Sequence, residues 1–229
     1  MTAQNFVLHP EFLSLITDTL VTVGSQKKPY LYFSKIQVLP HLNGAFTCTG
    51  QGLFGLECYK ALMVQILARD IIEADPDAPE IYRELWQQHI DLCTSRGDDM
   101  TDAKATVYHF GWVPAEDRIV GLEYKVGNDF ASTRIPDGCW LLPDTVSEIT
   151  VRNPDDLLRI TQKQKEIDDA LPVEQRAGIG GDFHHLYLSR EGVNIKHVFR
   201  AGDFDEVFRE MEEAFSKPAE INGNQKHKD

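Results

Sequence analysis

The sequence contains few cysteines and no long hydrophobic run. Its four cysteines stand singly among apolar residues and form no CxxC pair; they are Cys48, Cys58, Cys93 and Cys139. This pattern excludes a disulfide scaffold and a zinc site of paired cysteines, and we interpret the four as reduced, buried, small hydrophobic residues. Mostly apolar runs, such as that from Phe12 to Ile16, are far shorter than the roughly 20 residues that cross a bilayer. Because the N-terminus also lacks a signal-peptide pattern, we expect a cytoplasmic protein.

Positive charge is also scarce. The 229 residues include 23 Lys and Arg against 36 Asp and Glu, which gives a net charge of −13. An excess of negative charge disfavours non-specific binding to the phosphate backbone of nucleic acids, so we expect no nucleic acid partner. No Gly/Ser/Pro linker and no repeat divides the chain, so the sequence predicts a single domain over residues 1–216. Residues 217–229 contain one large apolar residue, Ile221, and are predicted to be a disordered polar tail.

The common catalytic and ligand-binding motifs are missing. The sequence has no GxSxG elbow, no Walker loop, no HExxH and no GxGxxG after a strand. His184 and His185 are adjacent on a predicted strand, so they point to opposite faces and cannot chelate one metal together. We therefore expect neither a metal nor a cofactor.

Hydrophobic periodicity predicts strands in consecutive pairs that are interrupted by two helices. The predicted strands are residues 6–8, 12–22, 30–33, 35–39, 44–49, 105–112, 119–126, 138–142, 182–189 and 193–199. The predicted helices are residues 54–71, 79–97, 153–170 and 203–215. Strands grouped in hairpins, with helices set apart from them, are typical of antiparallel sheets. The sequence thus predicts an α+β fold, a four-layer αββα sandwich of two antiparallel sheets between helix layers.

A candidate nucleophile stands at the start of the chain. Met1 precedes Thr2 and Ala3, whose small side chains permit removal of the initiator methionine. Removal would expose Thr2, whose free amine, with a reference pKa of about 8, can take the proton from its own hydroxyl. Such a site needs a cation near the amine and an acid that holds the cation.

Two charged residues follow Thr2 at distances that match a known family. Asp18 lies sixteen positions after Thr2 in the run FLSLITDTLVT, and Lys35 opens the stretch KIQVLPHLNGAFTCTG, which ends at Gly50. This arrangement resembles the proteasome β-subunit and HslV branch of the N-terminal-nucleophile hydrolases. The resemblance implies the αββα sandwich of those proteins, assembly into a homo-oligomer, and hydrolysis of amide bonds in peptides.

The resemblance also implies a role for each of these residues. Thr2 would be the nucleophile, Asp18 would orient Lys35, and Lys35 would lower the pKa of the Thr2 amine. The backbone N–H of Gly50 would donate to the oxyanion. The serine and the second aspartate that the family places near the amine have no clear counterpart, and Ser132 and Ser147 are candidates by position only.

Other interpretations of these residues stay open. Asp18 can be a strand-end residue that accepts hydrogen bonds from turn amides, Lys35 an edge lysine that prevents strand addition, and Gly50 a tight turn before a helix. Gln4 and Asn5 occupy positions where the family's first strand is usually apolar, which favours a noncatalytic structural or assembly subunit of the same fold. A small-molecule amidase with the same nucleophile is a further alternative.

Overall fold

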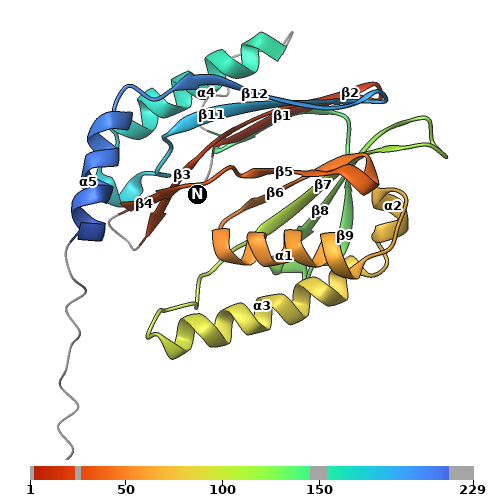
Figure 1. The fold of residues 1–229 in the computed structure, drawn as a ribbon, viewed down its shortest axis with the longest axis horizontal. Helices are drawn as coiled ribbons and strands as arrows, with labels where there is room; N and C mark the ends of the chain where they lie inside the picture. Colours follow the sequence, from red (N-terminus) through yellow and green to blue (C-terminus); the bar gives the residue numbers. More distant parts are fainter. Residues whose placement is uncertain (1–2, 24–26, 145–153, 217–229) are drawn as a thin grey trace, which may run out of the picture.

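Two five-stranded antiparallel sheets pack face to face in a computed structural model that describes residues 3–23, 27–144 and 154–216 (Figure 1). The first sheet has the strand order β10-β1-β2-β11-β12 and the second has the order β5-β6-β7-β8-β9. The strands of the first sheet are β1 (Gln4–Leu8), β2 (Phe12–Asp18), β10 (Gly138–Leu142), β11 (Asp182–Ser189) and β12 (Gly192–Arg200). Those of the second sheet are β5 (Ile36–Leu39), β6 (Gly44–Thr49), β7 (Thr106–Val113), β8 (Arg118–Lys125) and β9 (Ser132–Ile135).

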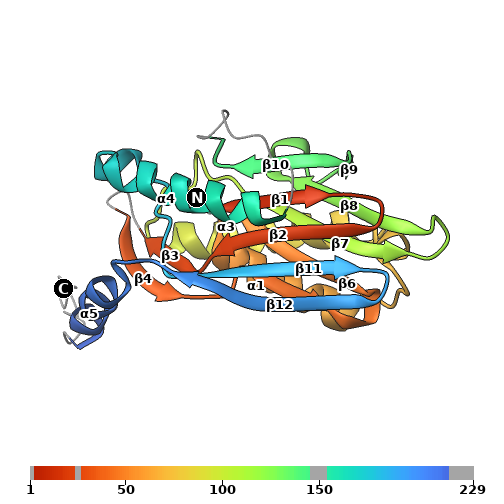
Figure 2. The same ribbon diagram turned by 90° about the horizontal axis from the view of Figure 1, so that it is seen from above.

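Helices cover the outer faces of the two sheets. The helices beside the second sheet are α1 (Gly52–Gln65), α2 (Ile71–Ala74) and α3 (Ala78–Ser95). Helix α4 (Pro154–Ala170) crosses the outer face of β1 and β2 (Figure 2). Strands β3 (Leu20–Val23) and β4 (Lys28–Tyr32) form a separate hairpin. Helix α5 (Phe204–Ser216) packs against β4 at one end of the molecule. The predicted αββα sandwich is therefore confirmed.

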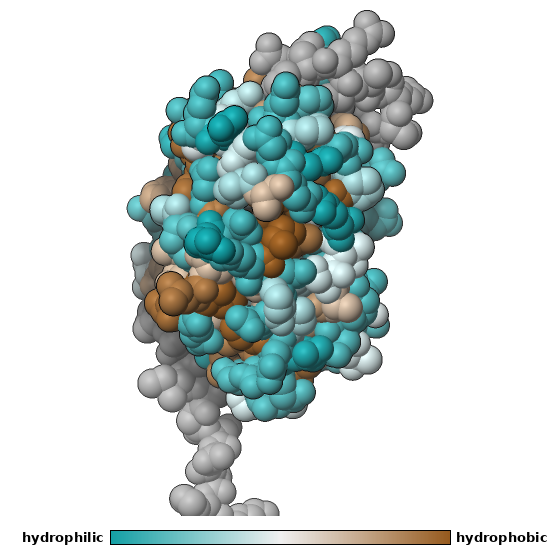
Figure 3. Space-filling model, turned by 90° about the vertical axis from the view of Figure 1, so that its right-hand side faces the viewer, coloured by the Kyte–Doolittle hydropathy of each residue, from teal (hydrophilic) through white to brown (hydrophobic). Residues whose placement is uncertain are grey.

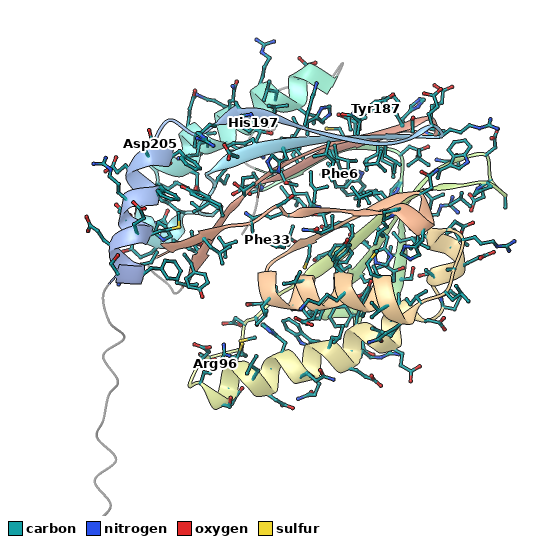
Figure 4. All side chains as sticks on the ribbon, viewed as in Figure 1. Phe6, Phe33, Arg96, Tyr187, His197 and Asp205 are labelled. Atoms are coloured by element: carbon teal, nitrogen blue, oxygen red, sulfur yellow. The ribbon has the colours of Figure 1, made fainter. Side chains whose placement is uncertain are left out.

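Strand alternation builds the interior between the sheets. Phe6, Leu13 and Leu15 point inward from the first sheet and meet Phe110 and Ile119 of the second. Each is at most 1% exposed, and Figure 4 shows Phe6 in the space between the two sheets. Burying side chains of this size contributes roughly 1.5–3 kcal/mol each. This apolar layer fixes which residues of each strand face the other sheet, and with them the geometry of the site described below.

The outer surface is more polar. On the face at the right-hand end of Figure 1, hydrophilic residues predominate and hydrophobic ones form separate patches (Figure 3). None of the helices in the described part of the chain has both the length and the apolar character that crossing a bilayer requires.

Two predicted elements differ from the structure, and one strand of the structure was not predicted. The helix expected over residues 54–71 ends at Gln65, because Asp70 caps a new helix, α2, by accepting from the N–H groups of Ile72 and Glu73. The strand expected over residues 12–22 breaks after Asp18, where the chain leaves the first sheet to pair with β4. Strand β9 was not predicted, because three of its four residues are exposed and it has no apolar alternation.

The predicted burial of the cysteines is partly wrong. All four are free thiols, but only Cys58 is buried, and Cys139 is exposed on edge strand β10. Cys48 and Cys93 are half-buried. The predicted tail, residues 217–229, lies outside the described residues.

The buried His109 makes the stability of the fold pH-dependent. Burial lowers the pKa of His109 on β7 from 6.5 to about 3, and its Nε2 forms a hydrogen bond with the Tyr82 hydroxyl of α3. Between these two pKa values, His109 is protonated in the unfolded chain and neutral in the folded one. From about pH 6 down to about pH 4, His109 therefore lowers the free energy of unfolding by up to about 1.4 kcal/mol per pH unit.

Urea denaturation across this range tests the effect with two variants. His109→Gln keeps an acceptor for Tyr82 and does not titrate, so its free energy of unfolding should fall less steeply on acidification. His41→Gln removes an exposed histidine and serves as the control. Equal slopes for wild type and His109→Gln would contradict the assignment.

Candidate active site

The carboxylate of Asp18 is the centre of a buried polar cluster at the end of β2. Asp18 is 0% exposed, and its Oδ1 accepts from Lys35 Nζ at 2.7 Å and from the backbone N–H of Ala3 at 3.1 Å. Its Oδ2 accepts from the backbone N–H of Gly180 at 3.1 Å. Three donors from distant parts of the chain thus converge on one side chain, which is the arrangement that keeps a buried carboxylate satisfied.

Lys35 reaches Asp18 from the residue just before β5. Its side chain is only 9% exposed, so the ion pair with Asp18 lies largely out of water. Burial raises the pKa of the Asp18 carboxyl above its ordinary value, while Lys35 and the amides of Gly180 and Ala3 act in the opposite direction. The 2.7 Å contact with Asp18, whose carboxylate is itself held by two backbone amides, fixes the position of the Lys35 ammonium. The predicted pairing of Asp18 with Lys35 is thus present as a contact.

A loop that the sequence analysis did not identify supports this carboxylate. Asp168, near the end of α4, accepts hydrogen bonds from the backbone N–H groups of Ala177, Gly178 and Ile179. The next residue is Gly180, whose N–H donates to Asp18 and whose carbonyl accepts from the N–H groups of Thr19 and Leu20. The turn of the chain after β2 is therefore held by residues 177–180.

Glycine is required in this loop because the backbone approaches β3 closely. A Cβ on Gly180 would lie 2.9 Å from Leu20 Cδ2, and a Cβ on Gly181 would lie 2.5 Å from Thr19 Oγ1. Gly181 also has a φ of +81°, in the left-handed region that favours glycine. The run AGIGGD was visible in the sequence, but nothing in it indicated its partner 162 residues earlier.

A pocket opens beside the ion pair on the α1 side of β6. Its lining is mostly apolar and includes both Lys35 and Gly50; the other lining residues are Leu20, Val21, Thr22, Phe33, Gln37, Phe46, Cys48, Gly52, Gly55 and Leu56. Burial raises the pKa of the Cys48 thiol to about 12, so this cysteine is protonated and not nucleophilic at neutral pH. Among the described residues that line this pocket, Lys35 alone carries a charge.

Gly50 adopts a conformation that few other residues tolerate. Its φ is +94°, and a Cβ there would collide with the carbonyl oxygen of Lys104. The turn from β6 into α1 therefore needs glycine for steric reasons. Gly50 is also one of the residues that line the same pocket as Lys35.

The candidate nucleophile lies outside the described residues. Thr2 is not described, but Ala3, the next residue, is 0% exposed and its N–H donates to the same Asp18 oxygen that holds Lys35. The two candidates for a second serine give no support. Ser132 is exposed on edge strand β9 and does not line the pocket with Lys35, and Ser147 lies outside the described residues.

Gln4 and Asn5, which occupy positions where the family's first strand is usually apolar, are buried and hydrogen-bonded. Gln4 Oε1 accepts from the Thr47 hydroxyl of β6 at 2.9 Å. Asn5 Nδ2 donates to Thr161 and Gln164 of α4, at 2.9 and 2.6 Å. The two polar residues therefore join β1 to the layers on either side of it.

The described residues contain no group of three or more His, Cys, Asp and Glu side chains that could hold a metal ion. His184 and His185 follow the alternation of β11. His185 Nε2 lies 2.8 Å from Ser14 Oγ on the outer face, and His184 pairs across the strands with His197.

Taken together, the layers and topology define the proteasome-like fold of the N-terminal-nucleophile hydrolases. Solved structures that match the chain include Anbu proteins. Anbu from Hyphomicrobium sp. strain MC1 matches with a TM-score of 0.56 and 11% identity, over 97% of this chain and 100% of that one. Anbu from Yersinia bercovieri, described as an ancestral beta-subunit, matches with a TM-score of 0.56 and 9% identity, over 94% of each chain.

A mutant form of the Hyphomicrobium Anbu matches in the same way, with a TM-score of 0.58 and 9% identity, over 94% of this chain and 95% of that one. Identities this low show likeness of fold alone. No protein-family model matches the chain, and no curated protein matches it.

These matches correct the sequence-based resemblance. The spacing of Thr2, Asp18 and Lys35 resembled the proteasome β-subunit and HslV branch, and that placement is wrong, because the structural neighbours described above are Anbu proteins. The resemblance rested on short motifs that proteins of related fold can share, so it indicated the fold correctly and the branch incorrectly. The proteasome-like sandwich is what remains of it.

Removing the charge of Asp18 should destabilise the protein strongly. Asp18→Asn leaves the buried ammonium of Lys35 without a counter-charge, which is expected to lower the free energy of unfolding by about 3 kcal/mol. The double variant Asp18→Asn/Lys35→Met removes both charges and should recover part of this loss. Urea denaturation measures each value.

A surface ion pair provides the matched control. Glu116 binds Arg134, with side chains 34% and 48% exposed, so Glu116→Gln should change the free energy of unfolding by less than about 1 kcal/mol. A loss for Asp18→Asn as small as that of Glu116→Gln would show that the Asp18 pair is not the buried constraint described here.

Proposed function

We propose that this protein is an N-terminal threonine hydrolase that cleaves amide bonds in peptides after removal of Met1, in the cytoplasm. The observation that carries the proposal is the carboxylate of Asp18, whose Oδ1 binds both Lys35 Nζ and the N–H of Ala3. The residue that precedes Ala3 is Thr2. One oxygen therefore fixes the lysine and the start of the chain relative to each other.

The reaction follows from the chemistry of these groups. Once Met1 is removed, the Thr2 amine takes the proton from its own hydroxyl, and the oxygen attacks the carbonyl carbon of the substrate. The Lys35 cation favours the neutral, proton-accepting form of that amine, because a nearby like charge disfavours protonation. Asp18 is a positioning residue in this scheme, since it acts through Lys35.

Breakdown of the tetrahedral intermediate completes the first half of the reaction. The N–H of Gly50 donates to the oxyanion, and the ammonium of Thr2 returns its proton to the leaving amine. The product is an ester between Thr2 and the acyl part of the peptide. Water, activated by the same amine, then hydrolyses the ester and restores the threonine.

The pocket beside Lys35 supports a peptide with an apolar residue on the acyl side of the cleaved bond. Leu20, Phe33 and Phe46 contribute to its lining, and a mostly apolar wall selects an apolar side chain by burial. We further propose that copies of the chain assemble into a homo-oligomer, which would restrict access to this site. One matching structure is described as an ancestral beta-subunit, which supports a subunit role.

Intact-mass measurement with a fluorogenic peptide assay tests the proposal. The purified protein should lack Met1, hydrolyse peptides with an apolar residue before the fluorophore, and form a one-to-one adduct with a β-lactone at Thr2. Thr2→Ala should lose at least about 1,000-fold in kcat, because it removes the nucleophile itself. Thr133→Ala, at an exposed threonine on β9, should retain full activity.

Two results would overturn the catalytic assignment. Retention of Met1 in an otherwise folded protein would leave Thr2 without a free amine and favour the noncatalytic assembly subunit. Peptide hydrolysis that survives Thr2→Ala would locate the activity elsewhere, or in a contaminant.

A further inference from the structure

A polar contact crosses the apolar interior between the two sheets. The Thr47 hydroxyl on β6 donates to Gln4 Oε1 on β1 at 2.9 Å, and both residues are 0% exposed. Neighbouring inward positions on these strands are apolar: Phe6 on β1 and Ala45 on β6 both belong to the inter-sheet core. The contact therefore replaces what would otherwise be apolar packing.

The contact joins the two strands from which the proposed chemistry comes. Gln4 lies two residues after Thr2, and Thr47 lies three residues before Gly50. A shift of one strand along or away from the other would change the distance between the nucleophile and the oxyanion donor. A hydrogen bond across the gap resists such a shift, because it is sensitive to both distance and angle.

Stability alone does not explain the buried polar cluster formed by Gln4, Thr17 and Thr47. The Nε2 of Gln4 is buried and has no hydrogen-bond partner among the described residues. The same holds for the Oγ1 of Thr17, which pairs with Gln4 across β1 and β2. Buried polar atoms without partners destabilise a fold, and an apolar pair of similar shape can be neutral or stabilising at such a position. Local departures of this kind are typical of functional sites.

We propose that Gln4 and Thr47 are a positioning pair, which sets the separation between β1, the strand that follows Thr2 in the sequence, and β6, the strand that leads to Gly50. This inference rests on the proposed function. Displacing reacting groups by about 1 Å can lower a rate by about 100-fold, so loss of a single cross-sheet bond has a measurable effect on kcat.

The geometry also predicts that substrate binding is spared. Side chains on β6 alternate, so Thr47 faces the first sheet while Phe46 and Cys48 line the pocket on the α1 side. Removing the Thr47 hydroxyl leaves the pocket wall in place. The expected signature is therefore a lower kcat with little change in KM.

Four variants test this pair. Gln4→Leu and Thr47→Val each remove the cross-sheet bond with a side chain of similar size, and each should lower kcat at least about tenfold while KM changes by less than about twofold. Thr47→Ser keeps the hydroxyl and should restore most of kcat. Thr17→Val removes a buried hydroxyl from the same cluster that makes no cross-sheet bond, and it should retain the wild-type kcat.

Two further measurements are made on the same variants. One is the rate of β-lactone adduct formation at Thr2, and the other is the midpoint of urea denaturation. Gln4→Leu and Thr47→Val should slow adduct formation while the urea midpoint stays at or above that of the wild type. A kcat equal to that of the wild type in both variants overturns the positioning role and leaves the proposed function intact. A lower kcat with a matching fall in urea midpoint and a raised KM also overturns it, because that pattern reports loss of structure. Failure of the wild-type protein to form the adduct overturns the proposed function and this inference together.

Discussion

The buried ion pair between Asp18 and Lys35 is the constraint on which the arrangement of the site depends. A carboxylate fully removed from water is stable only where its oxygens are occupied, and here an ammonium and two backbone amides occupy them. Each donor comes from a different part of the chain: the first strand, the approach to β5, and the loop before β11. Satisfying one side chain therefore holds three segments together.

Support for this carboxylate extends into the outer helix layer. Asp168 of α4 binds the loop at residues 177–179, and that loop presents the Gly180 N–H to Asp18. Asn5, on the outer face of β1, contacts Thr161 and Gln164 of the same helix. Helix α4 is thus hydrogen-bonded to β1 and to the loop whose Gly180 N–H donates to the Asp18 carboxylate. The helix layer takes part in positioning the site as well as in covering the sheet.

Much of the fold could be predicted from the sequence because its elements are marked locally. Strand alternation located β10 and β11 at their observed bounds, and the order of hairpins and helices gave the sandwich. The pairing of Asp18 with Lys35 was implied by the family resemblance, and the two residues are in contact. Short-range signals gave less where long-range contacts decide. Gln4 and Asn5 were interpreted only as departures from the family's apolar first strand, because their partners, Thr47 and Gln164, are distant in sequence. The Gly180 loop was missed for the same reason, and Thr2 remains a prediction.

The distance along the chain between Asp18 and Gly180 has a consequence for biosynthesis. The two residues are separated by 162 positions, so the carboxylate acquires its last donor only when most of the polypeptide is available. Contacts of such long range form late, since the entropy of closing a large loop must be overcome first. An incomplete chain emerging from the ribosome therefore lacks the finished pair, and the polar cluster assembles only as the domain closes.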